Sequence, residues 1–231
     1  MKNNKFFRLI IIVFISIIIL KFNMIGLFVF NFSRYTIDNN EIYQTDLYNK
    51  IEYSRFNIKT KECVRWYAHQ MSNELLNLNL NSKVLVLGVG LGGIIVELSN
   101  KRPDIIITGV DISDINFDIV MKYSNSEKII LIKEDANDYI RESNDMYDGI
   151  ICDLFDSIYV PEFVFTYAFL NKINNMLNKN GKFIINVPES NIEILKPVLD
   201  ESFPNNPYYL KKEFFEKRPY QNILSIVVKN N

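Results

Sequence analysis

Short apolar runs alternate with segments of helical periodicity from residue 83 onward. Apolar runs of this length predict buried strands, and apolar positions three or four residues apart predict helices. Because almost every strand position is apolar, both faces of the sheet are expected to be covered. The pattern predicts an α/β fold with a mostly parallel sheet and helices on both faces. The predicted strands lie in KVLVLGVG (83–90), which ends in glycines, and in DIIITGVDIS (104–113), KIILIKEDA (128–136), YDGIICDLFD (147–156) and KFIINVP (182–188).

Helical spacing also predicts helices at Lys61–Leu80, at LGGIIVELSNKRP before Pro103, and at Phe165–Leu177. The preceding tyrosine-rich segment mixes turn residues with alternating polarity, which predicts a linker with one or two short strands. The chain therefore divides into a hydrophobic N-terminus at 1–33, a region of linker, short strands and a helix at 34–82, and an α/β domain at 83–231.

The N-terminus is apolar from Leu9 to Phe32 apart from Lys21 and a few polar residues. About 20 apolar residues cross a bilayer, so we expect a preceding hydrophobic helix that anchors the chain as a single-pass membrane protein. A cleaved signal peptide and an interfacial segment remain alternatives. Basic residues before Leu9 favour a cytoplasmic N-terminus, which conflicts with a cytosolic cofactor for the domain, so the membrane side stays open.

Composition narrows the class of function. The 231 residues are 48% hydrophobic, which is enough for one domain with a sizeable core. The formal net charge of −1 gives no basic surface field, so nucleic acid is not an expected partner. Two cysteines give neither a disulfide framework nor a metal cluster. The single histidine, His69, excludes a multi-histidine metal site, so no metal is expected.

Acidic residues end three consecutive predicted strands: Asp111, Asp135 and Asp153. Parallel strands present their carboxyl ends at one edge of a sheet, where ligands of open α/β folds bind. One such acid is explained by a helix cap or a solvated turn. Three together indicate a shared binding site.

Glycines after the first strand suggest the kind of ligand. Gly88, Gly90, Gly92 and Gly93 let the backbone approach a ligand closely and open a helix with unpaired N–H groups. The spacing also fits a dinucleotide motif, but no hydride-transfer machinery follows it. An adenosyl sulfonium fits better, with Asp111 at the ribose, Asp135 at the adenine amino group and Asp153 at the amine and sulfonium end. Their neighbours Val89, Ile112 and Ala136 complete the expected cofactor-binding set.

Several motifs together resemble the spermidine synthase (aminopropyltransferase) family. VLVLGVGLGG is similar to its glycine motif, GVDIS to its ribose acid and KEDANDYI to its adenine-site strand end. The specific element is YDGIICDLFDSIYVPEFVFTYAFL, which resembles the family's catalytic loop with two acids three residues apart. LNKNGKFIINV, YNKIEYSRF and PYQNILSIVV extend the resemblance to about three quarters of the chain. It implies a Rossmann-like fold of the class I SAM-methyltransferase type and is compatible with a homodimer.

The resemblance implies roles for individual residues. Asp153 would bind, orient and deprotonate an acceptor amine, and Asp156 would help to hold a polyamine, unless it only caps a turn. His69 and Tyr220 would contact the substrate, although His69 is equally well explained as a packing residue. Asn49 lies where the family often has a glutamine over the donor.

The chain also departs from the family. Leu91 stands where the glycine motif normally carries an acid that holds the donor ammonium and disfavours the carboxylate of intact S-adenosylmethionine. The N-terminal β domain is reduced, and Ala68-His69-Gln70 lacks the family's tyrosine and glutamate. Three functions therefore remain: aminopropyl transfer from decarboxylated S-adenosylmethionine to a diamine, methyl transfer from S-adenosylmethionine to an unknown acceptor, and a membrane-tethered nucleoside-binding or scaffold domain without turnover.

Overall fold

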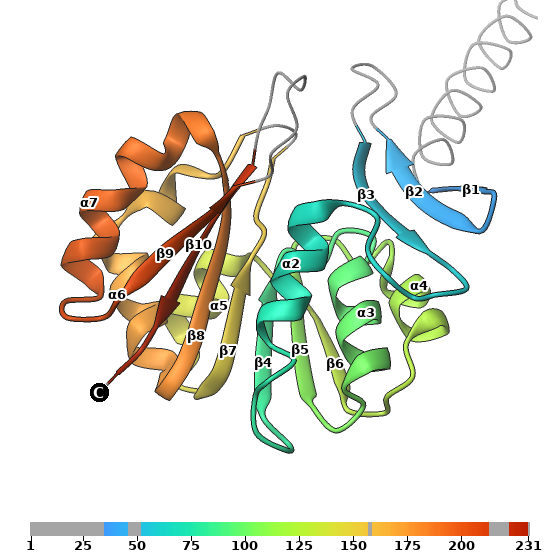
Figure 1. The fold of residues 1–231 in the computed structure, drawn as a ribbon, viewed down its shortest axis with the longest axis horizontal. Helices are drawn as coiled ribbons and strands as arrows, with labels where there is room; N and C mark the ends of the chain where they lie inside the picture. The colour runs from blue at the N-terminus through green and yellow to red at the C-terminus, as the bar shows by residue number, and fades with distance from the viewer. Residues whose placement is uncertain (1–34, 46–51, 157–158, 213–221, 231) are drawn as a thin grey trace, which may run out of the picture.

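The computed structural model describes residues 35–45, 52–156, 159–212 and 222–230 (Figure 1). The predicted anchor at Leu9–Phe32, Asn49 and Tyr220 lie outside these ranges. Within the described ranges, no helix is both long and apolar enough to span a bilayer.

A seven-stranded sheet with the order β6-β5-β4-β7-β8-β10-β9 forms the centre of the fold (Figure 1). The strands β4 to β8 pair in parallel, whereas β10 is antiparallel to both β8 and β9. The order changes direction at β4, and such a switch point opens a crevice at the carboxyl ends of the strands. The strands are β4 (Lys83–Leu87), β5 (Ile106–Asp111), β6 (Ile129–Lys133), β7 (Tyr147–Cys152), β8 (Leu177–Pro188), β9 (Tyr208–Lys212) and β10 (Asn222–Val228).

Helices cover both faces of this sheet, which confirms the predicted fold class. Leu85 and Leu87 of β4 pack in one apolar cluster with α5, α6 and α7, while Val84 and Val86 pack in another with α2, α3 and α4. Burial on both faces explains why β4 is apolar at nearly every position. The described helices are α2 (Trp66–Glu74), α3 (Gly93–Lys101), α4 (Phe117–Tyr123), α5 (Ala136–Glu142), α6 (Tyr167–Met176) and α7 (Ile192–Ser202), with 3₁₀ turns η1 (Glu162–Phe165) and η2 (Glu189–Asn191).

A small antiparallel sheet precedes this domain, with β1 (Thr36–Asp38), β2 (Glu41–Thr45) and β3 (Glu52–Asn57) in that order. Ile42 and Phe56, both fully buried, form a separate cluster with Leu91, Val96 and Ile119. The sheet is thereby fixed over the first turns of α3 and α4 (Figure 1). Leu91 is fully buried in this contact, so a glycine-loop position belongs to the packing of the N-terminal region.

The helix predicted at Lys61–Leu80 is shorter in the structure, where α2 spans Trp66–Glu74. Its predicted start is wrong because Cys63 bridges to Phe56 and the Val64 amide donates to the carbonyl of Arg55, which keeps this segment extended beside β3. Val64 is accordingly 44% exposed. The strand predicted from Lys182 begins earlier, since β8 already pairs with β7 at Leu177 and continues through an irregularity.

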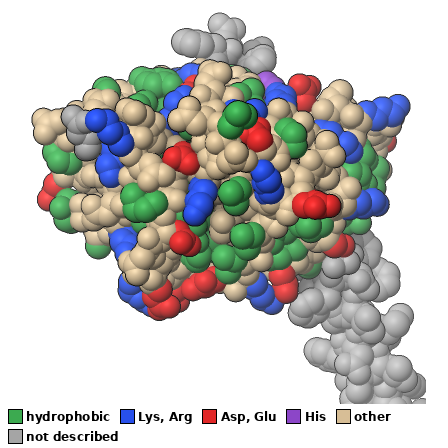
Figure 2. Space-filling model, turned by 90° about the horizontal axis from the view of Figure 1, so that it is seen from below, with side chains coloured by type: hydrophobic (Ala, Val, Ile, Leu, Met, Phe, Trp, Pro, Cys, Tyr) green, Lys and Arg blue, Asp and Glu red, His purple; other side chains and the backbone are tan. Residues whose placement is uncertain are grey.

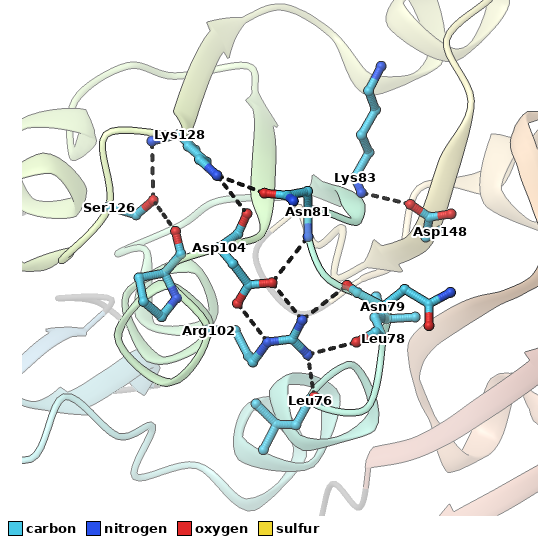
Figure 3. A network of polar contacts seen from close by, with 11 residues as sticks. Leu76, Leu78, Asn79, Asn81, Lys83, Arg102, Asp104, Ser126, Lys128 and Asp148 are labelled. Atoms are coloured by element: carbon cyan, nitrogen blue, oxygen red, sulfur yellow. Dashed lines mark hydrogen bonds and ion pairs between the residues drawn. The ribbon is translucent and has the colours of Figure 1, made fainter.

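Arg102 secures the connection between α2 and β4 (Figure 3). Its guanidinium donates to the carbonyl groups of Leu76, Leu78 and Asn79 and forms a two-pronged ion pair with Asp104, at 2.7 and 2.8 Å. The same guanidinium holds the pKa of the Asp104 carboxyl well below its usual range. The network lies where β4 begins, at the edge opposite the predicted site.

Charged side chains of both signs are interspersed on the face that Figure 2 shows, with apolar side chains scattered between them. Mixed charge of this kind is typical of a solvated surface and produces no field of a single sign.

Arg102→Lys is expected to lower the free energy of unfolding by about 1–3 kcal/mol, because one ammonium cannot replace a guanidinium that serves three carbonyls and a carboxylate. Urea denaturation measures this loss. Arg141→Lys is the matched control, since Arg141 pairs with Asp138 and Glu142 on the surface of α5 and is 62% exposed. It should cost less than about 0.5 kcal/mol, and equal losses in both variants would contradict the role given to Arg102.

Candidate functional site

The glycine loop joins β4 to α3, and its glycines serve different purposes. A β-carbon at Gly88 would lie 2.3 Å from the carbonyl oxygen of Asp153, so glycine is needed there to let β4 and β7 end side by side. A β-carbon at Gly92 would collide with Val120 at 2.2 Å. At Gly90, where φ is +53°, an added β-carbon would meet nothing within 4 Å. Gly90 is therefore the position at which the loop leaves open space for a ligand.

Asp111 holds this loop in place. Its Oδ2 accepts hydrogen bonds from the amides of Val89 and Gly90, both at 2.9 Å, and its Oδ1 accepts one from Ser113 at 2.9 Å. A carboxylate has about four lone-pair sites, so these three bonds leave capacity for a ligand hydroxyl. Ile112, which follows directly, is 71% exposed and offers an apolar surface beside the carboxylate.

Asp135 is the N-cap of α5. Its Oδ1 accepts hydrogen bonds from the amides of Asn137 at 2.8 Å and Asp138 at 3.4 Å. The capping explanation therefore holds for one oxygen of this acid, and Oδ2 makes no hydrogen bond to any residue that the structure describes. Ala136, in the first turn of α5, is buried.

Asp153 follows β7 and is the most perturbed acid of the set. Its backbone amide donates to the carbonyl of Leu87, and its Oδ1 accepts a hydrogen bond of 2.8 Å from Nδ2 of Asn186 on β8. Burial raises the pKa of the Asp153 carboxyl to about 6, and the bond from Asn186 opposes that rise. A carboxylate with such a pKa is ionised at neutral pH and accepts a proton more readily than a solvated one.

Asp156 is exposed and lies three residues further along the same loop. Its backbone exchanges two hydrogen bonds with Tyr159, at 2.8 and 3.0 Å. The side chain of Thr166, not that of Asp156, caps α6 by accepting from the amide of Phe169. Since the Asp156 carboxylate bonds to none of the described residues, it is available to a ligand.

His69 lies on α2 with Nδ1 2.7 Å from Oε1 of Glu97 on α3. Glu97 is fully buried and accepts hydrogen bonds from Lys101 at 2.6 Å and from the amide of Cys63 at 2.7 Å, whereas Nδ1 of His69 lies close to it without hydrogen-bond geometry. A buried carboxylate needs such partners, so the contact gives His69 a structural role whether or not it also reaches a substrate. Burial raises the pKa of the Cys63 thiol most, and the negative charges of Glu97 and Asp153 raise it further.

Two residues beside the site, Asn186 and Asn116, were not predicted from the sequence. Asn186 is 1% exposed and bonds to Asp153. Asn116 is 4% exposed, and its Nδ2 donates to the carbonyl of Gly90 at 3.1 Å and to Gln44 of β2 at 3.2 Å, which joins the small sheet to the glycine loop. An amide in an otherwise apolar strand, as in KFIINVP, is the signal that would have revealed Asn186. Among the described residues, no three His, Cys, Asp or Glu side chains are grouped to hold a metal ion.

The chain is similar to known proteins over most of this region. Residues 69–202 match the family model of the spermine/spermidine synthase domain. A polyamine aminopropyltransferase of Buchnera aphidicola is 28% identical over 191 residues, covering 78% of this chain and 64% of that protein. A probable polyamine aminopropyl transferase of Bifidobacterium longum is 26% identical over 168 residues, covering 67% of this chain and 37% of that protein. The chain thus spans less than two thirds of the length of either relative.

A solved structure shows the same fold. The crystal structure of a probable spermidine synthase from Corynebacterium glutamicum superimposes with a TM-score of 0.66 at 14% identity, covering 84% of this chain and 79% of that one. At that identity the likeness concerns the fold alone, and it agrees with the Rossmann-like arrangement described above.

Gly88→Ala is expected to destabilise the protein by roughly 3 kcal/mol or more, because its methyl group would meet a backbone carbonyl that cannot move aside. Gly90→Ala is the control, where only the positive φ is strained, at a cost of about 1–2 kcal/mol. Urea denaturation of both variants gives the comparison. A loss at Gly90 as large as that at Gly88 would refute the close contact between the loop and Asp153.

Asp153→Asn is expected to stabilise the protein at pH 7. The folded state raises the pKa of Asp153 from 3.8 to about 6, so this group's contribution to stability is complete at low pH and is lost as pH rises through about 6. The asparagine removes a partly buried, poorly solvated charge and can still accept the bond from Asn186, so the gain at pH 7 should be on the order of 2 kcal/mol. Thermal unfolding between pH 4 and pH 8 tests this. The gain should shrink towards pH 4, and a gain of the same size at pH 4 and at pH 8 would contradict the prediction.

Proposed function

Because the chain belongs to the spermine/spermidine synthase family, we propose that it transfers an aminopropyl group from an adenosyl sulfonium donor to a diamine. One observation supports this most directly. A partly buried carboxylate with a pKa of about 6, Asp153, stands beside the glycine loop, and an exposed carboxylate, Asp156, follows on the same loop. Two acids at this spacing suit a substrate with two cationic nitrogens.

The donor would occupy the crevice at the switch point, beside Gly90. Asp111 has remaining capacity for a ribose hydroxyl, and Asp135 has a free oxygen for the adenine amino group. The exposed side chain of Ile112 offers an apolar surface next to Asp111. The buried Ala136 follows Asp135 after the end of β6. The donor brings a carbon bonded to a sulfonium, which leaves as a neutral thioether.

The acceptor step demands a base. A diamine arrives as an ammonium, with a pKa near that of lysine at about 10, and only its neutral form is a nucleophile. In the proposed step Asp153 takes one proton from the bound ammonium, the neutral nitrogen then forms a bond to the carbon, and the carbon–sulfur bond breaks. The products are a secondary ammonium and a neutral thioether, so one proton is released in all and Asp153 holds it. Asp156 would bind the distant ammonium of the acceptor and fix its orientation.

One observation favours methyl transfer as a second candidate. Leu91 is fully buried between the small sheet and α3, so this position places no carboxylate beside the donor. Without that charge, nothing at this position repels the carboxylate of intact S-adenosylmethionine. Calorimetry of the full-length protein with S-adenosylmethionine and with its decarboxylated form, side by side, separates the two candidates by which donor binds more tightly.

Asp153→Asn is expected to lower turnover by about 10²–10⁴-fold in single-turnover assays with decarboxylated donor and a panel of diamines, because an amide cannot accept the proton. Asp156→Asn should raise the KM for the acceptor more than it lowers kcat, since it contributes mainly ground-state binding.

Aminopropyl transfer that is unchanged in Asp153→Asn would rule out this base. If Asp153→Asn still transfers methyl groups at the wild-type turnover but binds the cofactor more weakly, the second candidate, methyl transfer, is favoured. Tight donor binding without turnover towards any acceptor would indicate a nucleoside-binding domain.

A further inference from the structure

Asn186 places an amide where the rest of the strand is apolar. It lies near the carboxyl end of β8, is 1% exposed and pairs across the sheet with Leu224 of β10. Its strand neighbours Ile185 and Val187 are fully buried. Burying an amide is unfavourable unless its polar atoms are hydrogen-bonded, so this side chain requires an explanation.

Only half of that amide is satisfied. Nδ2 donates to Oδ1 of Asp153 at 2.8 Å, whereas the buried Oδ1 of Asn186 has no hydrogen-bond partner among the described residues. A buried carbonyl oxygen without a partner costs free energy, and an apolar residue of the same shape would avoid that cost. Folding alone therefore does not account for an asparagine here.

We propose that Asn186 is a positioning residue for the transfer reaction, which holds Oδ1 of Asp153 and leaves Oδ2 to the substrate amine. The identity of that amine rests on the proposed function, but the contact between the two side chains does not. A carboxylate fixed through one oxygen presents the other in a single direction, as a base or an ammonium ligand requires.

The surroundings of Asp153 give Asn186 a second effect. Among the described residues, the charge of Asp153 acts on the thiols of Cys152 on β7 and of Cys63 before α2, and burial raises the pKa of both, so neither carries charge at neutral pH. Asp156, on the same loop, is exposed. Within the described residues, Asn186 is the side chain that donates a hydrogen bond to Asp153, and this bond opposes the effect of burial. Asn186 thereby keeps Asp153 ionised at neutral pH.

The test is a titration of Asp153 in the full-length protein without donor or acceptor. Asn186→Leu has nearly the same volume and lacks the donor. Carboxyl ¹³C NMR, with the Asp153 signal assigned by its loss in Asp153→Asn, should show the pKa of Asp153 rising by about one unit above its wild-type value, a tenfold change in proton affinity. If Asn186→Leu does not fold, Asn186→Ala removes the same donor without adding volume.

Ser225→Ala is the matched control. Ser225 on β10 is also fully buried, and its hydroxyl has no hydrogen-bond partner among the described residues. The substitution alters a neighbouring strand without touching Asp153, so the Asp153 titration should stay as in the wild type. An unchanged pKa in Asn186→Leu, or an equal change in Ser225→Ala, would overturn the proposal.

Kinetics add a readout that a purely structural role would not move. The acid limb of the pH profile of kcat/KM should shift upward with the Asp153 pKa in Asn186→Leu, and part of the lost rate should return above pH 8, where Asp153 is again ionised. A rate loss that is independent of pH would contradict this role. The NMR titration is independent of catalysis, so a chain that transfers no aminopropyl group can still confirm or refute the contact.

Discussion

The close approach of Gly88 to the backbone of Asp153 is the constraint on which the rest of the site depends. The two strands that end at these residues, β4 and β7, are neighbours at the switch point of the sheet. Because Gly88 has no side chain, the glycine loop can turn directly over the end of β7. Asp111 then fixes the loop through two of its amides, and Asn186 fixes the carboxylate of Asp153 from the other side. Within the part of the chain that the structure describes, Asp111, Asp135 and Asp153 are thus held by backbone and amide groups and not by opposite charges.

This arrangement separates the energetic roles of the acids. Asp111 and Asp135 accept hydrogen bonds from backbone amides, which stabilises the fold. Each carboxylate retains lone pairs that can accept a hydrogen bond from a ligand. Asp153 is partly buried with one amide partner, and loss of solvation raises its pKa to about 6 against the opposing hydrogen bond from Asn186. Such a group destabilises the folded protein at neutral pH, and strained or poorly solvated groups of this kind cluster at functional sites.

The small N-terminal sheet explains how the chain accommodates its main departure from the family pattern. Leu91 stands where the family pattern has an acid, and its side chain forms part of a buried apolar cluster with Ile42 and Phe56. The leucine therefore has a packing role at this position. Asn116 joins the same sheet to the glycine loop through Gln44 and Gly90. Leu91 therefore joins the glycine loop to the docking of the small sheet through one residue position.

The sequence by itself determined the class of fold and the location of the site. Continuous apolar runs are required where a strand is covered on both faces, so the strands in KVLVL and YDGIICD were predictable. Acids that follow parallel strands lie at the carboxyl edge of the sheet, so the common location of Asp111, Asp135 and Asp153 was predictable too. Tertiary structure alone decided which partners those acids have. Nothing local in the chain places Asn186 beside Asp153, 33 residues away, shortens α2 by pairing Cys63 with Phe56, or ties His69 to Glu97. These contacts depend on the register of neighbouring strands and on helix packing, which patterns of polarity do not specify.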